Sequence, residues 1–159
     1  MARLLAQQAT APTAAHLDTD HFFNAIAKGF IEPWRTESQA QNNTLTRSIA
    51  AAALELAKGD FEVIVDGVIG PWFLPEYQTL LKQYTLNYVV LRPSAAVAAE
   101  RARNREQGPL AEYPPRIYDA LAQLGELERH VIDTTAHTQT ETLTAIQDGL
   151  ASGRFLLGE

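Results

Sequence analysis

The sequence predicts a doubly wound α/β domain, in which helices cover both faces of a parallel sheet. Short apolar, β-branched runs alternate with longer helical patterns along the whole chain. Two of these runs end in an aspartate, and neither an internal repeat nor a linker separates them. Strands that alternate with helices in this way form parallel sheets, so residues 1–159 are predicted to form a single domain.

Strands are expected where a short apolar run meets a turn, and helices where a capping residue precedes a longer pattern. The predicted strands are Ala14–Leu17, Phe61–Asp66, Tyr88–Leu91 and His130–Asp133. The predicted helices are Ala2–Gln8, Thr36–Lys58, Phe73–Lys82, one from Ser94 through the arginines that follow it, one from Pro114 to before Gly125, and one from Thr138 to about Leu150. Thr36 with Gln39, and Thr138 with Glu141, have the spacing of a capping box.

Composition excludes several classes of protein. The chain has 46% hydrophobic and 20% charged residues, and no apolar run is long enough to cross a bilayer. The N-terminal residues MARLLAQQATAP lack the features of a signal peptide and are interpreted as a short helix. Cysteine is absent, which excludes disulfides, thiolate zinc sites and cysteine nucleophiles. We therefore expect a cytoplasmic protein that does not insert into a membrane.

The charge distribution favours a small anionic ligand over nucleic acid. The net charge is −6, whereas nucleic-acid binding requires a basic face. Arg101, Arg103 and Arg105 nevertheless form a basic cluster, followed by an irregular stretch with Gly108 and Pro109. A basic segment before such a loop is typical of a lid over a phosphoryl group, and we expect the lid at about residues 101–113. The alternative is a solvated helix end, where cations are favoured.

Three acids follow predicted strands, at the sheet edge where parallel sheets bind ligands. Asp18 and Asp20 come after the first strand, and Asp66 ends the second. Their carboxylates suit a Mg²⁺ that keeps several waters, or a general base that accepts a proton from a hydroxyl. In the alternative interpretation, Asp18 caps a following helix and Asp20 is a solvated acid of its first turn.

Other polar and aromatic residues give weaker signals. The four histidines lack the spacing of a zinc site, and no Gly-x-Ser-x-Gly motif is present. Trp34 is either a substrate platform or a packing residue. The polar residues at the start of the long helix would either hydrogen-bond a substrate or face water, and they are Gln39, Gln41, Asn42 and Asn43.

Taken in order, several segments resemble the small P-loop kinases. These segments are HLDTDHFF, GFIEPW, QNNTL, VIVDGVIGPWFLP, YVVLRPSAAVAAERARNR and ELERHVIDTT. The resemblance is to the group of shikimate kinase, gluconate kinase, chloramphenicol phosphotransferase and nucleotide kinases, including cytidylate kinase-like proteins and AAA-type ATPases. It implies a three-layer, parallel-sheet P-loop NTPase fold of the nucleotide kinase type, without its first strand.

For the acceptor side, the resemblance implies roles for the acids and two further residues. Asp18 and Asp66 would hold Mg²⁺, Asp66 being the acid that ends the Walker B strand. Asp20 would contact or deprotonate the acceptor. Trp34 and Arg47 would contribute to substrate binding.

For the nucleotide side, the resemblance implies ATP bound near the lid. Arg101 and Arg105 would be catalytic lid arginines, and Arg101 and Arg103 would contact the nucleotide. The loop after Asp133 would lodge the adenine. The partner implied is a small molecule with a hydroxyl or phosphate acceptor, and the protein would be a monomer or a homodimer.

One motif of this family is missing from the sequence. No Gly-x-x-x-x-Gly-Lys-Ser/Thr occurs, although Ala2–Gln7 is similar to the helix that follows it. That loop cradles the phosphates, and the strand before it is central to the sheet. A start codon placed too late, a truncated chain and a degenerate relative are three accounts of this absence.

The expected function is therefore an ATP- and Mg²⁺-dependent phosphotransferase. One alternative is a non-catalytic remnant of the P-loop fold that acts as a binding module. The other is a haloacid dehalogenase-like phosphatase, with Asp18 as nucleophile and Asp20 as acid/base. Phe22 occupies the position at which that family has a threonine or valine, which argues against it.

Overall fold

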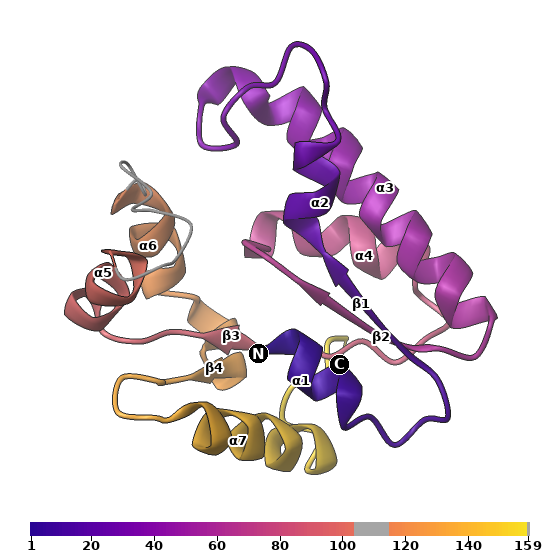
Figure 1. Ribbon diagram of the computed structural model, residues 1–159, viewed down its shortest axis with the longest axis vertical. Helices are drawn as coiled ribbons and strands as arrows, with labels where there is room; N and C mark the ends of the chain where they lie inside the picture. Colours follow the sequence, from indigo (N-terminus) through magenta and orange to yellow (C-terminus); the bar gives the residue numbers. More distant parts are fainter. Residues whose placement is uncertain (104–114, 159) are drawn as a thin grey trace. The chain divides into compact units, whose positions relative to one another are not determined.

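The computed structural model describes residues 1–103 and 115–158 (Figure 1). The chain is an α/β protein that divides into two compact units, Met1–Thr85 and Leu86–Glu159. Within the described residues, each unit contains a two-stranded parallel sheet. The α/β class predicted from the sequence is thus confirmed, whereas the three-layer P-loop arrangement and the single domain stay predictions.

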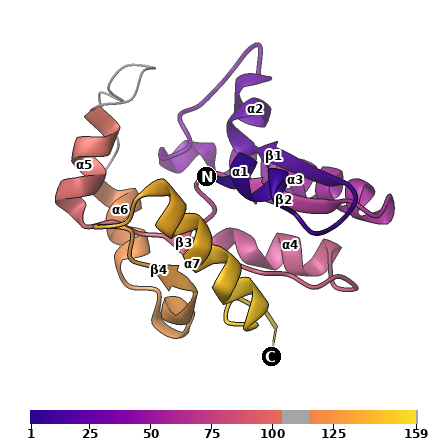
Figure 2. The same ribbon diagram turned by 60° about the horizontal axis from the view of Figure 1, so that its bottom comes forward.

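The first unit is built around one pair of strands. Its elements are α1 (Ala2–Gln7), β1 (Ala14–Asp18), α2 (Thr19–Asn24), η1 (Thr36–Ser38), α3 (Gln39–Lys58), β2 (Glu62–Asp66), η2 (Pro71–Phe73) and α4 (Leu74–Leu80). β1 and β2 run parallel, and both α1 and α3 contact the two strands (Figure 2). α3 also contacts α2 and α4. The long helix therefore contacts both strands and two of the other helices of this unit.

The core of the first unit lies mainly along α3. The buried residues of this helix recur every three or four positions, as one apolar stripe requires, and they are Asn42, Thr46, Ile49, Ala50 and Ala53. Leu74 and Tyr77 of α4 are buried as well, as is Leu81, which follows it. All residues of β1 and β2 are only partly buried, although the sequence pattern predicts a buried strand at Phe61–Asp66.

The second unit contains shorter strands than the sequence predicts. Its elements are β3 (Val90–Leu91), α5 (Ala95–Arg103), α6 (Pro115–Ala122), η3 (Gly125–His130), β4 (Val131–Ile132) and α7 (Gln139–Ala151). β3 pairs with β4 in parallel over two residues each. The N–H of Tyr88 instead donates to the carbonyl of Phe155 at 2.8 Å, so the start of the predicted strand Tyr88–Leu91 pairs with the C-terminal segment.

A buried histidine and a buried phenylalanine form the centre of the second unit. His130 and Phe155 are both 0% exposed. The His130 Nδ1–H donates to the carbonyl of Tyr88 at 2.8 Å, and its Nε2 accepts from Arg129 Nε at 3.1 Å. A Cβ at Gly149 would lie 2.0 Å from the Phe155 ring, so this ring requires the glycine. His130 thus belongs to η3 and the core, and the predicted strand His130–Asp133 shrinks to β4.

The two predicted capping boxes have different outcomes. The box of Thr138 and Glu141 is confirmed at the start of α7, with both reciprocal hydrogen bonds formed. The box of Thr36 and Gln39 is wrong, because Thr36 starts the 3₁₀ turn η1 and α3 begins at Gln39. The Ser38 hydroxyl precedes α3 but donates to the carbonyls of Pro33 and Arg35, so it is not a cap.

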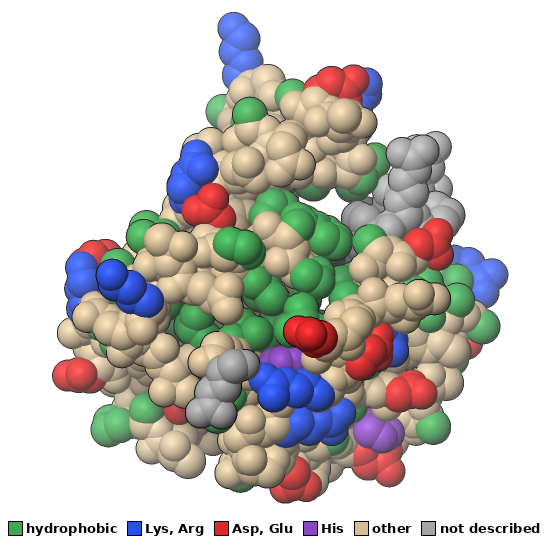
Figure 3. Space-filling view, turned by 180° about the vertical axis from the view of Figure 1, so that it is seen from behind, with side chains coloured by type: hydrophobic (Ala, Val, Ile, Leu, Met, Phe, Trp, Pro, Cys, Tyr) green, Lys and Arg blue, Asp and Glu red, His purple; other side chains and the backbone are tan. Residues whose placement is uncertain are grey.

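Charged side chains of both signs are scattered over the face shown in Figure 3, with hydrophobic side chains between them. Seven large hydrophobic side chains of the described residues are exposed, among them Trp72 and Trp34. In the part of the chain that the structure describes, none of the helices has the length and apolar character needed to cross a membrane.

Candidate functional site

Two of the predicted metal ligands lie opposite each other at the ends of β1 and β2. The parallel register pairs Asp18 with Asp66, the last residue of each strand. Because carboxyl ends of parallel strands meet at one edge of a sheet, both carboxylates are presented at that edge, where such sheets bind ligands. The sequence prediction that these two acids converge is consistent with this register.

Asp18 also begins the next helix. It is the N-cap of α2, and its Oδ1 accepts a hydrogen bond from the backbone N–H of Asp20 at 2.9 Å. This satisfies one of the free N–H groups at the start of the helix. The capping alternative for Asp18 therefore describes the structure, and Asp20 lies in the first turn of α2, exposed to solvent. Among the described residues, none forms a hydrogen bond or an ion pair with the carboxylate of Asp20.

Asp66 has a partner that sequence reasoning missed. His16 of β1 pairs with it through Nε2 and the carboxylate Oδ1. The spacing of the histidines excludes a zinc site, and nothing in that spacing indicates a partner for Asp66. The signal that could have revealed this pair is the two-residue period of a strand, which puts His16 on the same face as Asp18. Asp66 is the register partner of Asp18 on the neighbouring strand.

The two strand ends approach each other closely at Gly67. A Cβ on this residue would lie 1.8 Å from Thr19 Oγ1, and its φ of 148° is one that residues with a side chain rarely adopt. Thr19 is itself only 6% exposed. The contact between Gly67 and Thr19 therefore fixes the spacing between the segment that holds Asp18 and Asp20 and the segment that follows Asp66.

The loop between α2 and α3 is held by the polar residues at the start of α3. The Gln41 side chain donates to the carbonyl of Ile31 at 2.6 Å and accepts from its N–H at 2.9 Å. Asn42 Nδ2 donates to the carbonyl of Pro33 at 2.7 Å. These two residues thus bind their own loop. They leave Trp34, which is 41% exposed, at the surface of that loop.

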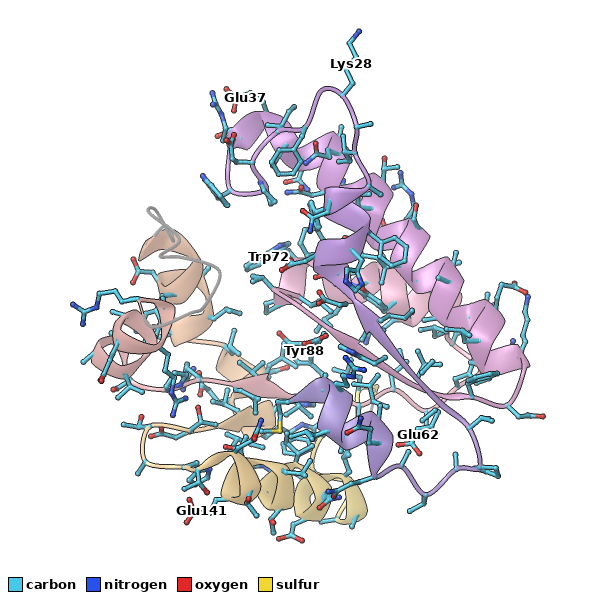
Figure 4. The ribbon with its side chains drawn as sticks, viewed as in Figure 1. Lys28, Glu37, Glu62, Trp72, Tyr88 and Glu141 are labelled. Carbon is cyan, nitrogen blue, oxygen red and sulfur yellow. The ribbon has the colours of Figure 1, made fainter. Side chains whose placement is uncertain are left out.

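The remaining polar residues of this region face solvent. Gln39 and Asn43 hydrogen-bond each other on the exposed side of α3. Lys28 projects from the loop, and Glu37 lies on η1 (Figure 4). Arg47 reaches Glu76 of α4, with 3.7 Å between the guanidinium and the carboxylate. A role of Arg47 in substrate binding stays a prediction.

The three arginines of the predicted lid have different environments. The Arg101 guanidinium donates to the carbonyl of Thr134 at 2.9 Å, which ties α5 to the segment after β4. Arg103 is exposed at the end of α5. Arg105 lies outside the described residues, as does most of the predicted lid at 101–113. Within the described part of the chain, Arg101 therefore anchors α5, and the side chain of Arg103 stays exposed.

The predicted adenine loop after Asp133 is organised by its own hydrogen bonds. Both the N–H and the hydroxyl of Thr135 donate to Asp133 Oδ1, and these bonds, the hydroxyl first, lower the pKa of Asp133. Thr135 Oγ1 also accepts from the N–H of Ser94 at 2.8 Å. Thr135, which Asp133 holds, thus connects the segments that follow β3 and β4, and a role of Asp133 in cofactor binding stays a prediction.

An ion pair of the second unit was also missed by sequence reasoning. Arg92, which follows β3, contacts both carboxylate oxygens of Glu128 at 2.9 and 2.8 Å. This pairing, together with the N–H of Leu124, lowers the pKa of Glu128 to about 2. Arg92 also donates to the carbonyls of Leu121 and Ala122. It therefore fixes the end of α6, and no local sequence pattern indicates this.

The donor set at the end of β1 and β2 fits a weakly held divalent cation. Among the residues that the structure describes, no group of three or more histidine and acidic side chains forms a complete metal site. Mg²⁺, however, commonly binds through one or two carboxylates and keeps several waters. Asp18 and Asp66 each have one oxygen that accepts from a described residue and one that does not. A role of Asp18 and Asp66 in metal binding stays a prediction.

Comparison with known proteins gives no match, either to a protein-family model or to a curated protein.

Proposed function

We propose that the chain is an ATP- and Mg²⁺-dependent phosphotransferase of the P-loop kinase type. The observation that supports it best is the parallel pairing of β1 and β2, with Asp18 opposite Asp66 at their carboxyl ends. The resemblance to small P-loop kinases assigns a metal-linked acid to each of these positions. The substrate would be a small molecule with a hydroxyl or phosphate acceptor.

Asp20 would accept the proton of the attacking hydroxyl. Asp20 is exposed, and its carboxylate has no hydrogen bond or ion pair with another described residue, so a substrate could reach it. Its backbone N–H is fixed by Asp18, which limits where the side chain can be. General-base catalysis requires a group within hydrogen-bond reach of the proton that it removes, and Asp20 would have to hold the acceptor hydroxyl at that distance.

Asp18 and Asp66 would hold Mg²⁺, which neutralises the charge that develops on a transferred phosphoryl group. Arg103, exposed at the end of α5, and Arg105 would add positive charge, as lid arginines do. Arg101 would act differently in this state of the protein, because its guanidinium already binds Thr134. It would hold α5 in place and orient the segment that carries the other two arginines.

The proposal is tested with two proteins, this chain and this chain preceded by the residues encoded directly upstream. Each is incubated with ATP labelled at the γ-phosphate, Mg²⁺ and a panel of small hydroxyl compounds. We expect label to move to one of these compounds if the upstream residues supply a phosphate-binding loop. Asp20→Asn should abolish this transfer and leave ATP binding intact.

One control variant and two possible results decide the test. Asp60 is an exposed aspartate outside the site, and the variant Asp60→Asn should transfer label like the wild-type protein. Equal turnover of Asp20→Asn would remove Asp20 from the mechanism. If neither protein transfers label and neither is stabilised by ATP against heat, the proposal is wrong, and the non-catalytic binding module becomes the better interpretation.

A further inference from the structure

We infer that Trp72 forms a stacking platform for the planar aromatic ring of a small-molecule ligand. The indole lies on η2, in the short segment that follows the carboxyl end of β2 (Figure 4). Parallel sheets bind their ligands beyond this end of the strands. The inference rests on the proposed function in one respect, because it takes the molecule that carries the ring to be the phosphoryl acceptor.

Gly70 lies against one face of the Trp72 ring. A Cβ on Gly70 would be 2.3 Å from Cη2, 2.3 Å from Cζ2 and 2.5 Å from Cε2 of the indole, which are consecutive carbons of its six-membered ring. A point beside the edge of the ring could not be almost equally distant from all of them, so the Cβ position faces the flat side. The glycine therefore makes room for the ring, and the indole lies on its backbone.

The rest of η2 also restricts the indole. The rings of Trp72 and Phe73 make a T-shaped contact, with centroids 5.9 Å apart and an interplanar angle of 61°. Pro71 is the first residue of η2 and fixes the backbone φ there. The indole is thus positioned by its own segment. A side chain that is already in place loses little conformational freedom when a ligand stacks on it.

About half of Trp72 is open to solvent. Its exposed fraction is 49%, the highest among the exposed large hydrophobic side chains of the described residues. The surface of a flat ring is mainly that of its two faces. Since Gly70 lies against one of them, the exposed half corresponds to the opposite face. This face is the surface on which a second planar ring can stack.

The surroundings of Trp72 suit a small ligand better than a protein partner. Val68, earlier in the same segment, is 44% exposed, and these are the two exposed large hydrophobic side chains of residues 67–73. A stable protein interface buries about 800 Å² on each partner, which is far more than two side chains provide. A cavity of about 30 Å³, bordered by Val68, Phe73 and residues of α2 and α3, has room for a methyl or hydroxyl group. It is too small for a ring, so the ring has to lie on the exposed indole.

The test measures binding by ligand-observed NMR titration, which needs neither ATP nor turnover. The probes are adenosine, cytidine and benzyl alcohol, with ribose as the non-aromatic compound, and each of them carries a hydroxyl group. We expect the three aromatic compounds to bind more tightly than ribose. Trp72→Leu should weaken their binding about 5-fold or more, the loss that removal of a stacking partner causes. Trp72→Phe keeps a smaller ring, and its affinity should lie between those of the leucine variant and the wild-type protein.

Gly70→Ala tests the platform without removing its ring. Gly70 has a φ of −76°, which alanine adopts without strain, so the added Cβ acts by displacing the indole. It should weaken binding of the aromatic compounds, and it should have no further effect when Trp72→Leu is already present. Phe61→Leu is the matched control, because Phe61 is an exposed aromatic residue directly before β2, at the opposite end of that strand. The fluorescence of Trp34 reports whether the first unit of Trp72→Leu is folded.

Binding decides the inference, whereas phosphoryl transfer decides the proposed function. A wild-type protein that binds the aromatic compounds no better than ribose would overturn the inference, as would equal affinities of Trp72→Leu and Phe61→Leu. Tighter binding of the nucleosides than of benzyl alcohol would support it and identify a nucleobase as the source of the ring. If the aromatic compounds bind as expected but no compound receives label from ATP, the proposed function is wrong and the stacking platform stands. Transfer of label in a protein that binds no aromatic compound would have the opposite meaning.

Discussion

Gly67 is the position at which the structure predicts the largest effect of adding a single methyl group. A Cβ there would lie 1.8 Å from Thr19 Oγ1 and 2.9 Å from its Cβ, so it cannot be accommodated by a rotation of the Thr19 side chain alone. The φ of 148° adds backbone strain for any residue with a side chain. Strain of this kind costs about 1–3 kcal/mol, and overpacking costs about 1–3 kcal/mol more. Gly67→Ala should therefore lower the free energy of unfolding by about 2–6 kcal/mol, the sum of these two ranges.

The assay is urea unfolding of the first unit, followed by tryptophan fluorescence. Both tryptophans of the chain lie in this unit, so the signal does not mix the two units. Gly29→Ala is the matched control, because Gly29 also has a positive φ, of 79°, but has nothing within 4 Å of the added Cβ. It should show the backbone cost alone, about 1–2 kcal/mol. If Gly67→Ala unfolds at the same urea concentration as Gly29→Ala, the close contact with Thr19 does not exist as described.

Three more predictions concern the second unit and are measured by circular dichroism. His130→Leu leaves the carbonyl of Tyr88 without its donor in the core, and it should destabilise this unit by about 1–3 kcal/mol in urea; unchanged stability would contradict the buried hydrogen bond. The pKa of Glu128 is lowered to about 2. The pairing of Glu128 with Arg92 therefore stabilises the fold above the ordinary glutamate pKa, and this stabilisation is lost as the pH falls toward 2. Glu128→Gln should flatten the dependence of stability on pH between about pH 4.5 and 2. Thr138→Ala removes the cap of α7 and should cost about 1 kcal/mol, whereas Thr140→Ala, inside the helix, should cost less.

The elements that local patterns specify were predictable from the sequence. β1 and β2 are found close to the predicted residues, because each is a short apolar run that ends in an acid. The cap of α7 needs only residues within one helical turn, and it forms as predicted. The predicted capping box of Thr36 and Gln39 failed although the two residues are close in sequence, because Thr36 starts the 3₁₀ turn η1 and α3 begins only at Gln39.

The candidate site was predictable in its acids but not in its contacts. The positions of Asp18 and Asp66 follow from where their strands end. The pairing of His16 with Asp66 could not be derived without the strand register, since fifty positions separate the two residues. The role of Gln41 depends on a loop that folds back over ten residues to Ile31. Polarity alone cannot distinguish such a residue from one that binds a substrate.

The structure also shows why counting cations is a poor guide to a phosphate site. Arg92 follows β3, and Arg101 lies on α5, the helix after that strand. Both guanidiniums nevertheless bind groups of the protein itself. Arg101 holds the carbonyl of Thr134, and Arg92 holds Glu128. A guanidinium that fixes the backbone offers fewer donors to an anion, because its five N–H groups point in fixed directions. Within the described residues of the predicted lid, Arg103 is the better candidate for contact with a phosphate.

Asp18 illustrates how the two interpretations of a polar residue can both hold. A carboxylate has two oxygens, and capping of α2 occupies only Oδ1. Asp18→Asn keeps an oxygen that can cap the helix but removes the charge, because asparagine is as good an N-cap as aspartate. It should therefore retain the stability of the first unit and weaken binding of Mn²⁺, which prefers the same oxygen ligands as Mg²⁺, whereas Asp18→Ala should also lose about 1 kcal/mol of stability. Tryptophan fluorescence in urea and a Mn²⁺ titration measure these two effects separately. If Asp18→Asn binds Mn²⁺ like the wild-type protein, then Asp18 is only a helix cap, and the cation site must be sought elsewhere.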